Sequence, residues 1–346
     1  MSATVAPDHI LKELADLWVS LGKEGQSEGG AGVLRACSMT LVVLAEESDD
    51  VMALGETIAA LMPEHPARAI VVRLRGAGER ALTERVYSQC WMPFGQRRQI
   101  CCEQIELTAS DASLADLPSV VLPLAVPDLP LILWCRTPRL LGMPEFHQIA
   151  AMARKVVVDS AKVPDPELAL GRMAELSRLG VLLGDLSWTK LTRWREMLSQ
   201  VFENQQYLGQ LARISSVRVS FGEDHEVAAR FMAVWIANAL ADVGVRAETA
   251  VKPEDAAGGG SPSRPAIARS RVPVTLRVSL AGGGLSVELV READRLVITV
   301  NGFSHCTNLP QPSDYLLMRE ELGIVRHDAV FERTLASAAR LAYPTD

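Results

Sequence analysis

The sequence of 346 residues lacks the features that mark several large classes of protein. It has only six cysteines, none spaced as Cys-x-x-Cys, which argues against a disulfide scaffold and a zinc site. No window holds the roughly 18 to 20 apolar residues that cross a bilayer. The nearest run, residues 119–135, is interrupted by three prolines and Asp128. Residues 2–8 have neither a basic nor an apolar segment, so we expect no signal peptide and no membrane partner.

Catalytic signatures are also missing. There is no Walker A loop, no Gly-x-Ser-x-Gly, no His-Glu-x-x-His and no kinase motif. No two of the six histidines have the helical i, i+4 spacing of metal ligands. The stretch from Gly76 to Ala81 formally fits a dinucleotide-binding fingerprint, but Glu79 would repel a pyrophosphate, so we interpret it as a plain strand-to-helix turn. The sequence therefore predicts no enzyme, no cofactor and no metal.

The composition indicates a soluble protein of two domains. Hydrophobic residues make up 48% and charged residues 22%, which is enough to bury substantial cores. The length suits two domains of ordinary size. The net charge of -7 argues against nucleic acid as the main partner and favours a cytoplasmic protein. The six cysteines are expected to be reduced and mostly buried thiols.

The N-terminal domain, residues 1–160, is predicted to be α/β. Apolar periodicity and breakers predict helices at 9–21, 49–62, 79–90, 114–124 and 145–154, and strands at 36–45, 68–74, 97–108, 129–134 and 156–159. Strands that alternate with helices imply a mixed or parallel sheet with helices on its faces.

The C-terminal domain, residues 161–346, is predicted to be α+β. We expect helices at 165–178, 187–202, 223–241, 314–322 and 328–342, and strands at 214–221, 272–280, 285–291, 296–300 and 302–308. Asn301-Gly302 is a strong hairpin signal, so the sheet should be largely antiparallel. A glycine- and proline-rich stretch predicts a flexible insertion at about 252–270.

Three blocks place charged residues at the end of an apolar element, and the first and third of them also contain tryptophan. The first is Asp128-Leu-Pro-Leu-Ile-Leu-Trp134-Cys-Arg136, the second is Val156-Val-Val-Asp159-Ser160, and the third runs from Asp185 to Glu196. A tryptophan ring supplies contact area and a guanidinium supplies direction, which is typical of a binding surface.

Each block also has a structural interpretation. Arg136 and Asp159 could form an internal ion pair that caps the sheet, instead of facing a ligand beyond the strand ends. In the third block, Trp194 lies on the apolar stripe of a helix and is expected in the core. Trp188 and Arg195 lie off the centre of that stripe and are the better surface candidates.

Taken in order, the three blocks resemble the OpcA family, the glucose-6-phosphate dehydrogenase assembly proteins of cyanobacteria and actinobacteria. The family patterns are matched by Asp128, Leu129, Pro130, Leu133, Trp134, Arg136, Val156–Ser160, Asp185, Leu186, Trp188, Leu191, Thr192, Trp194, Arg195 and Glu196. The resemblance is dense from about residue 118 to 202. Cys135 departs from the family, whose members often carry a second tryptophan there.

The resemblance implies a non-enzymatic partner that binds glucose-6-phosphate dehydrogenase, promotes its active oligomer and raises its apparent affinity for glucose 6-phosphate. The residues that we expect to bind the partner are Trp134, Arg136, Asp159, Ser160, Asp185, Trp188, Lys190, Arg193 and Arg195. One alternative is an α/β enzyme or binding protein whose own sugar-phosphate or nucleotide site uses Arg136, Asp159 and Ser160. Another is a scaffold that stabilises the dehydrogenase without changing its kinetics.

Overall fold

The computed structural model describes residues 6–27, 33–92, 99–254 and 275–342, and it divides into two compact units. Unit 1 comprises Met1–Asp159, Leu176–Asp185 and Asp314–Arg326, and unit 2 comprises Ser160–Glu175, Leu186–Ser313 and His327–Asp346. The insertion predicted at 252–270 lies, from residue 255 onward, outside the described residues.

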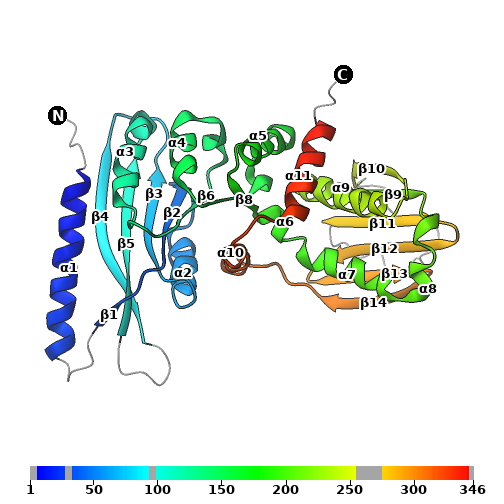
Figure 1. Ribbon diagram of the computed structural model, residues 1–346, viewed down its shortest axis with the longest axis horizontal. Coiled ribbons are helices and arrows are strands. Elements are labelled where there is room, and N and C mark those ends of the chain that lie inside the picture. The colour runs from blue at the N-terminus through cyan, green and yellow to red at the C-terminus, as the bar shows by residue number, and fades with distance from the viewer. Residues whose placement is uncertain (1–5, 28–32, 93–98, 255–274, 343–346) are drawn as a thin grey trace. The chain divides into compact units, whose positions relative to one another are not determined.

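Unit 1 is built on an eight-stranded sheet with the order β1-β5-β3-β2-β6-β7-β8, and β4 pairs with the other side of β5 (Figure 1). Every pairing is parallel except β4 with β5. The strands are β1 (Val33–Arg35), β2 (Met39–Glu46), β3 (Ala67–Leu74), β4 (Leu82–Trp91), β5 (Gln99–Ala109), β6 (Leu131–Cys135), β7 (Lys155–Val158) and β8 (Leu182–Asp185). A mainly parallel sheet confirms the predicted N-terminal fold.

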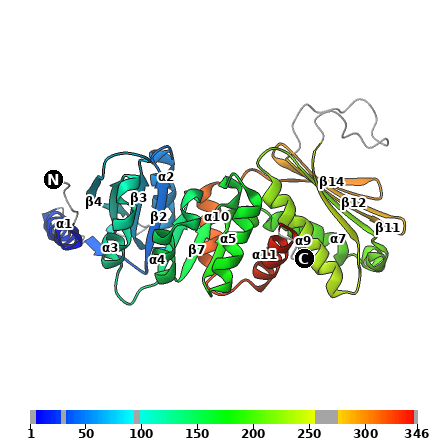
Figure 2. The ribbon, with the colours of Figure 1, turned by 90° about the horizontal axis from the view of Figure 1, so that it is seen from above.

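Helices cover both faces of this sheet. They are α1 (Pro7–Ser27), α2 (Val51–Leu61), α3 (Leu117–Val121), α4 (Pro144–Met152) and α10 (Asp314–Gly323), while α5 (Pro166–Arg178) begins in unit 2 and ends in unit 1. Figure 2 shows α2 on one face and α3 and α4 on the other. Strands β2 and β3 are buried almost throughout, as central strands covered on both faces must be.

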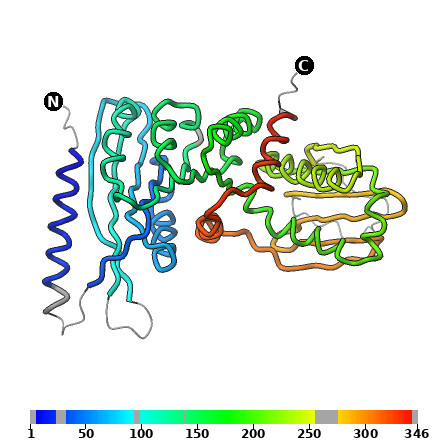
Figure 3. The backbone as a smooth tube through the Cα atoms, viewed as in Figure 1, coloured from blue at the N-terminus to red at the C-terminus, as the bar shows by residue number. Residues whose placement is uncertain are grey.

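Unit 2 is built on a six-stranded sheet with the order β10-β9-β11-β12-β13-β14. Only β10 with β9 is parallel, and the last four strands form a meander that Figure 3 traces. The strands are β9 (Ser216–Phe221), β10 (Glu248–Pro253), β11 (Leu276–Gly282), β12 (Leu285–Glu292), β13 (Arg295–Val300) and β14 (Phe303–Asn308). The largely antiparallel C-terminal sheet is therefore confirmed.

The helices of unit 2 are α6 (Leu186–Thr189), α7 (Thr192–Glu203), α8 (Gln205–Leu208), α9 (Glu226–Asp242) and α11 (Ala329–Ala342). The helix predicted at 187–202 is divided into α6 and α7 between Thr189 and Thr192. None of the helices in the described parts of the chain is long and apolar enough to cross a membrane.

The helix predicted at 79–90 is wrong, because this segment contains strand β4. Leu82 is buried against neighbouring elements, and the strand runs antiparallel to β5 over its whole length. Thr83, Val86 and Tyr87 are β-branched or aromatic residues that suit a pleated surface, and they outweigh the helical spacing that the apolar residues also permit. The Gly76 loop therefore leads from β3 into a strand, which removes the helix that a dinucleotide fingerprint requires.

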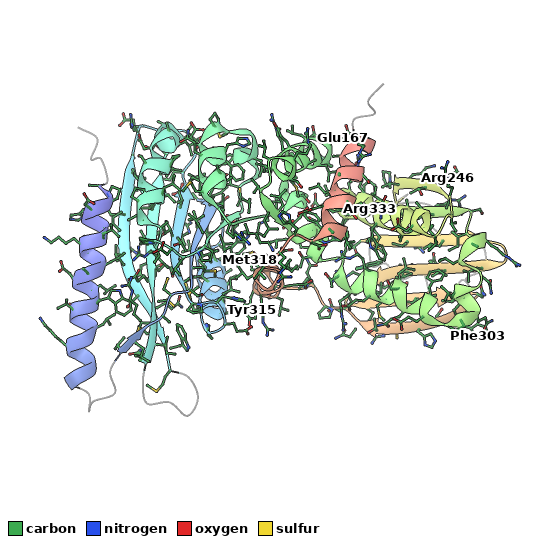
Figure 4. All side chains as sticks on the ribbon, in the orientation of Figure 1. Glu167, Arg246, Phe303, Tyr315, Met318 and Arg333 are labelled. Carbon is green, nitrogen blue, oxygen red and sulfur yellow. A yellow bond between two sulfur atoms is a disulfide. The ribbon has the colours of Figure 1, made fainter. Side chains whose placement is uncertain are left out.

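The expectation that all six cysteines are reduced is also wrong. Cys90 on β4 and Cys101 on β5 form a disulfide, drawn as the yellow bond in Figure 4. The two residues face each other directly in the antiparallel pair, with a Cα–Cα distance of 4.0 Å. The predicted helix had placed Cys90 on another type of element, so the sequence offered no reason to pair them.

Candidate functional site

The first candidate cluster forms where β6 ends. Trp134 has no exposed surface, because β6 lies between β2 and β7 and helices cover the sheet. The guanidinium of Arg136 stacks over the Trp134 ring, with its Cζ 4.8 Å from the ring centroid. Its Nη2 lies 3.0 Å from Oδ1 of Asp49, and its Nη1 bonds Asp314. One guanidinium thus joins the end of β6, the loop after β2 and the start of α10.

The electrostatics of this cluster are those of a closed internal network. Burial lowers the pKa of Arg136, but hydrogen bonds to Asp49 and Asp314 outweigh it and raise the pKa above its usual value. Its charge is therefore fixed and already compensated by two carboxylates. Arg136 is internally paired, as the alternative interpretation expected, but the predicted acid was wrong: its carboxylate partners are Asp49 and Asp314 and not Asp159.

A pocket at the same carboxyl edge of the sheet has two carboxylates and one arginine in its lining. It measures about 420 Å³ and is lined by Glu46, Glu47, Ser48, Leu74, Arg75 and Gly76. Glu46 also accepts hydrogen bonds from Thr137 and from Arg139, whose Nε lies 2.7 Å from Oε1. Nε of Arg75 lies 3.5 Å from Oε1 of Glu47, so the cation in this lining is already paired and is poorly placed to bind the phosphate of a sugar phosphate or nucleotide.

The acids and the serine that follow β7 and β8 are buried. Ser160 and Asp185 have no exposed surface and Asp159 is nearly buried, and all three interact with neighbouring groups. In this conformation they have little or no surface to offer a partner.

The second candidate cluster belongs to unit 2 and surrounds Trp188 on α6. The ring packs against Phe231 of α9 and Phe331 of α11, with centroids 5.9 and 5.7 Å away. Arg195 of α7 covers the remaining face, with its Cζ 3.6 Å from the ring centroid and its Nη1 2.8 Å from the Trp188 carbonyl oxygen.

The expectation that Trp188 lies at the surface is wrong, because its exposed fraction is only 3%. Its position off the helical stripe made it a surface candidate, but α9 and α11 approach from distant parts of the sequence and cover it. Trp194 is buried, as its place on the stripe predicted. Arg195 is half-buried against Trp188.

Two cations of the third block remain accessible. The side chain of Arg193 is 70% exposed, and its Nη1 lies 2.8 Å from Oε2 of Glu196. Lys190 is half-buried and has at least one neighbouring partner. Of the nine predicted site residues, Arg193 is the one whose charged group extends furthest into solvent.

Of the predicted site residues, Trp134 and Arg136 thus belong to a cluster in unit 1, and Trp188 and Arg195 belong to a cluster in unit 2. Asp49 and Asp314, which complete the first cluster, were not anticipated. Asp49 follows a strand and begins a predicted helix, so its place near the end of the sheet could be predicted. Asp314 lies 178 residues from Arg136, and nothing in the sequence around it indicates that the two residues are in contact. Within the described ranges, no three His, Cys, Asp or Glu residues are grouped so that they could hold a metal ion.

Comparison with known proteins assigns the family. Residues 58–175 match the family described as glucose-6-phosphate dehydrogenase subunit N-terminal domain, and residues 182–335 match its C-terminal domain. A relative from Nostoc punctiforme, named as the OxPP cycle protein OpcA, is 30% identical over 141 residues, covering 41% of this chain and 30% of that protein. A relative of the same name from Synechocystis is 24% identical over 190 residues, covering 54% and 39%.

The stretches matched in these relatives span well under half of the relatives' own length. Among solved structures, a dehydrogenase from Chromobacterium violaceum aligns with 89% of this chain and 94% of its own, at 11% identity and a TM-score of 0.47. That similarity is too low to carry an argument about function. The two family matches and the named relatives together show that the chain belongs to the OpcA family of glucose-6-phosphate dehydrogenase assembly proteins.

Proposed function

We propose that the chain binds glucose-6-phosphate dehydrogenase as a non-enzymatic assembly factor and allosteric activator. In this role it promotes the active oligomer and raises the apparent affinity for glucose 6-phosphate. The observation that carries the proposal is the family match, which extends through both halves of the chain and whose two parts are described as domains of a subunit of that enzyme. Internal pairing of Arg136 and Arg195 supports only the non-enzymatic part of this proposal, because these two cations are already engaged within the chain and not free to bind a substrate.

Activation requires that the chain bind the active form of the dehydrogenase more tightly than the inactive form. A partner with equal affinity for both forms would shift no equilibrium. A coupling free energy of about 1 to 3 kcal/mol would change the apparent affinity for substrate roughly 5- to 150-fold. An effect of that size needs only a few well-placed contacts.

We propose that the nine predicted residues divide into contact residues and supporting residues. Arg193 is the contact residue with the greatest exposure, and Lys190 lies just before it in the same segment. The supporting residues are buried or internally paired and hold this segment and the end of β6 in place. They are Trp134, Arg136, Asp159, Ser160, Asp185, Trp188 and Arg195.

The exposed arginine gives the sharpest test of this surface. We expect Arg193→Glu to weaken binding to the host's dehydrogenase about tenfold or more while leaving the thermal unfolding of this chain unchanged. Arg246→Glu is the matched control, because Arg246 is an exposed arginine elsewhere in unit 2, labelled in Figure 4. Equal binding by both folded variants would remove Arg193 from the interface.

The two alternatives have distinct signatures. An independent ligand site predicts that the isolated chain binds glucose 6-phosphate or NADP in a calorimeter, with no dehydrogenase present. In the pocket that contains Glu46 and Glu47, the one cation of the lining, Arg75, is already paired with Glu47, which argues against such a site. A scaffold without allosteric effect predicts an unchanged apparent affinity for glucose 6-phosphate once the dehydrogenase is fully oligomeric.

A further inference from the structure

Unit 2 contains a large pocket that the proposed function does not use. It has a volume of about 680 Å³ and lies among α9, α11 and the ends of β9 and β10. Figure 2 shows α9 and α11 side by side, and the two helices are in contact. The volume falls within the range of roughly 300 to 1,000 Å³ that small-molecule sites occupy.

One wall of the pocket is apolar because of the alternation along β10. Val251 and Pro253 are two residues apart and so point to the same side of the sheet, where they line the pocket. Val234 and Ala237 of α9 lie on one helical face and complete the wall, and Phe221 from the end of β9 supplies an aromatic ring. The apolar part of a small ligand can therefore be buried against this wall.

The charged groups that line the pocket differ in how they are compensated. Nη2 of Arg230 lies 2.7 Å from Oε1 of Glu226 and 3.2 Å from Glu167, so this cation is compensated by two carboxylates. Arg340, in the last turn of α11, lines the pocket without a carboxylate partner among the described residues. Its Nε is directed to the Ala336 carbonyl oxygen at 3.3 Å. Of the two arginines in the lining, Arg340 is therefore the one available to pair with an anion.

Uncharged polar residues also line the pocket, among them Ser337 and Asn238. Ser337 lies three residues before Arg340 and so projects from the same face of α11. Asn238 of α9 has a buried Nδ2 that finds no acceptor within the described parts of the chain. Because the amide can rotate, a ligand oxygen could accept a hydrogen bond from this group and satisfy it.

We infer that this pocket binds a small amphipathic monoanion, such as an aromatic carboxylate or sulfonate. Its apolar body lies against Val234, Ala237 and Val251, and its anionic group pairs with Arg340. Two other pockets of unit 2 do not offer this combination. One of about 280 Å³ is apolar and has no Lys or Arg among its described lining residues. One of about 560 Å³ has Lys162 beside four carboxylates, those of Glu223, Asp224, Glu226 and Glu254.

The test uses 8-anilinonaphthalene-1-sulfonate, a fluorescent amphipathic monoanion, titrated into the intact folded chain. We expect saturable binding at one site. Ala237→Trp fills the pocket and should abolish the fluorescence gain, and Val251→Phe should weaken it. Val243→Ser is the control, because Val243 is an exposed apolar residue just after α9 that lies outside the pocket lining. Circular dichroism and thermal melting check the fold of each variant.

Arg340→Gln separates recognition of the charge from apolar contact. We expect about tenfold weaker binding of the sulfonate probe and unchanged binding of the neutral analogue N-phenyl-1-naphthylamine. Unsaturable binding, or equal binding by wild type and a folded pocket-filling variant, would overturn the proposal. If both filling variants fail to fold, the affinities of Arg340→Gln for the two probes test the proposal instead. The proposal is overturned if this substitution weakens binding of both probes equally, or if it weakens binding of neither. The readout requires no dehydrogenase, so its failure would leave the proposed function untouched.

Discussion

At the scale of single residues, buried charges in unit 1 are stabilised by several partners at once. Glu103 on β5 accepts hydrogen bonds from Nε1 of Trp18 and Nε of Arg68, both at 2.5 Å, and pairs with Arg35 at 2.6 Å. These partners come from α1, β3 and β1, so one carboxylate connects three elements to β5. Such a network is costly to break, because removal of one charge leaves another buried without compensation.

Glu103→Gln should therefore be strongly destabilising. The neutral amide leaves the buried Arg68 without its carboxylate, and we expect the free energy of unfolding to fall by about 3 kcal/mol or more. Chemical denaturation measures this. Glu79→Gln, at an exposed position in the loop before β4, is the control and should change stability by less than about 0.5 kcal/mol. Equal stability of the two variants would contradict the network.

The reactivity of the free thiols gives a second prediction at the scale of single residues. Burial raises the pKa of Cys135 to about 12 and that of Cys102 to about 11, so both remain protonated at neutral pH. Only the thiolate reacts readily with iodoacetamide. In a brief reaction at pH 8 we expect mass spectrometry to find the exposed Cys306 alkylated and Cys102 and Cys135 unmodified. Modification of Cys135 as fast as Cys306 would show that the end of β6 is open to solvent.

At the scale of elements, helix α10 is held to unit 1 by charges along its length. Lys155 of β7 pairs with Glu321 at 2.7 Å, and both side chains are only 3% exposed. The same ammonium donates to the carbonyl oxygens of Glu321 and Ile324. On the outer side, Arg319 reaches Glu64 at 2.7 Å, beside the Tyr315 labelled in Figure 4. This helix comes from the C-terminal half of the sequence, yet it completes the N-terminal unit.

Gly184 of β8 leaves the space that the Lys155–Glu321 ion pair occupies between β7 and α10. A Cβ at this position would lie 2.7 Å from Cδ of Glu321 and 3.0 Å from Cε of Lys155, so Gly184→Ala forces the ion pair to shift. We expect the free energy of unfolding to fall by about 1 to 3 kcal/mol. Gly55→Ala is the matched control, because a Cβ there meets nothing within 4 Å and alanine favours the helix α2. A stabilising Gly184→Ala would contradict the packing.

The sequence predicted elements whose signal is local and failed where the decisive partner is distant. Strands β2 and β3 and the hairpin at Asn301-Gly302 could be predicted, because an apolar run and a turn dipeptide are signals that lie within a few residues of sequence. Strand β8 is only four residues long and was missed, as was β10. The burial of Trp188 depends on Phe231 and Phe331, and periodicity on one helix cannot reveal what another helix places against it.

At the scale of the whole molecule, the chain passes between its two units several times. Unit 1 takes its last strand from Leu176–Asp185 and a helix from Asp314–Arg326, each enclosed in the sequence by segments of unit 2. A cut at the predicted boundary, after Ser160, therefore does not yield a complete unit. It removes β8, the neighbour of β7, and also the acid that pairs with Lys155.

We therefore expect the fragment 1–160 to lack cooperative folding. The edge of β7 loses its hydrogen-bonding partner, and Lys155 is left as a buried charge without Glu321. Hydrogen exchange should show faster exchange in β6 and β7 of the fragment than in the full chain. Equal protection in both would mean that the N-terminal segment folds by itself.

The proposed function requires that the whole chain bind glucose-6-phosphate dehydrogenase. The direct measurement mixes the purified chain with its host's glucose-6-phosphate dehydrogenase at micromolar concentration, and follows sedimentation and the titration with glucose 6-phosphate in one sample. We predict a co-sedimenting complex and a decrease in the KM for glucose 6-phosphate of about fivefold or more. Independent sedimentation of the two proteins, with an unchanged KM, would contradict the account.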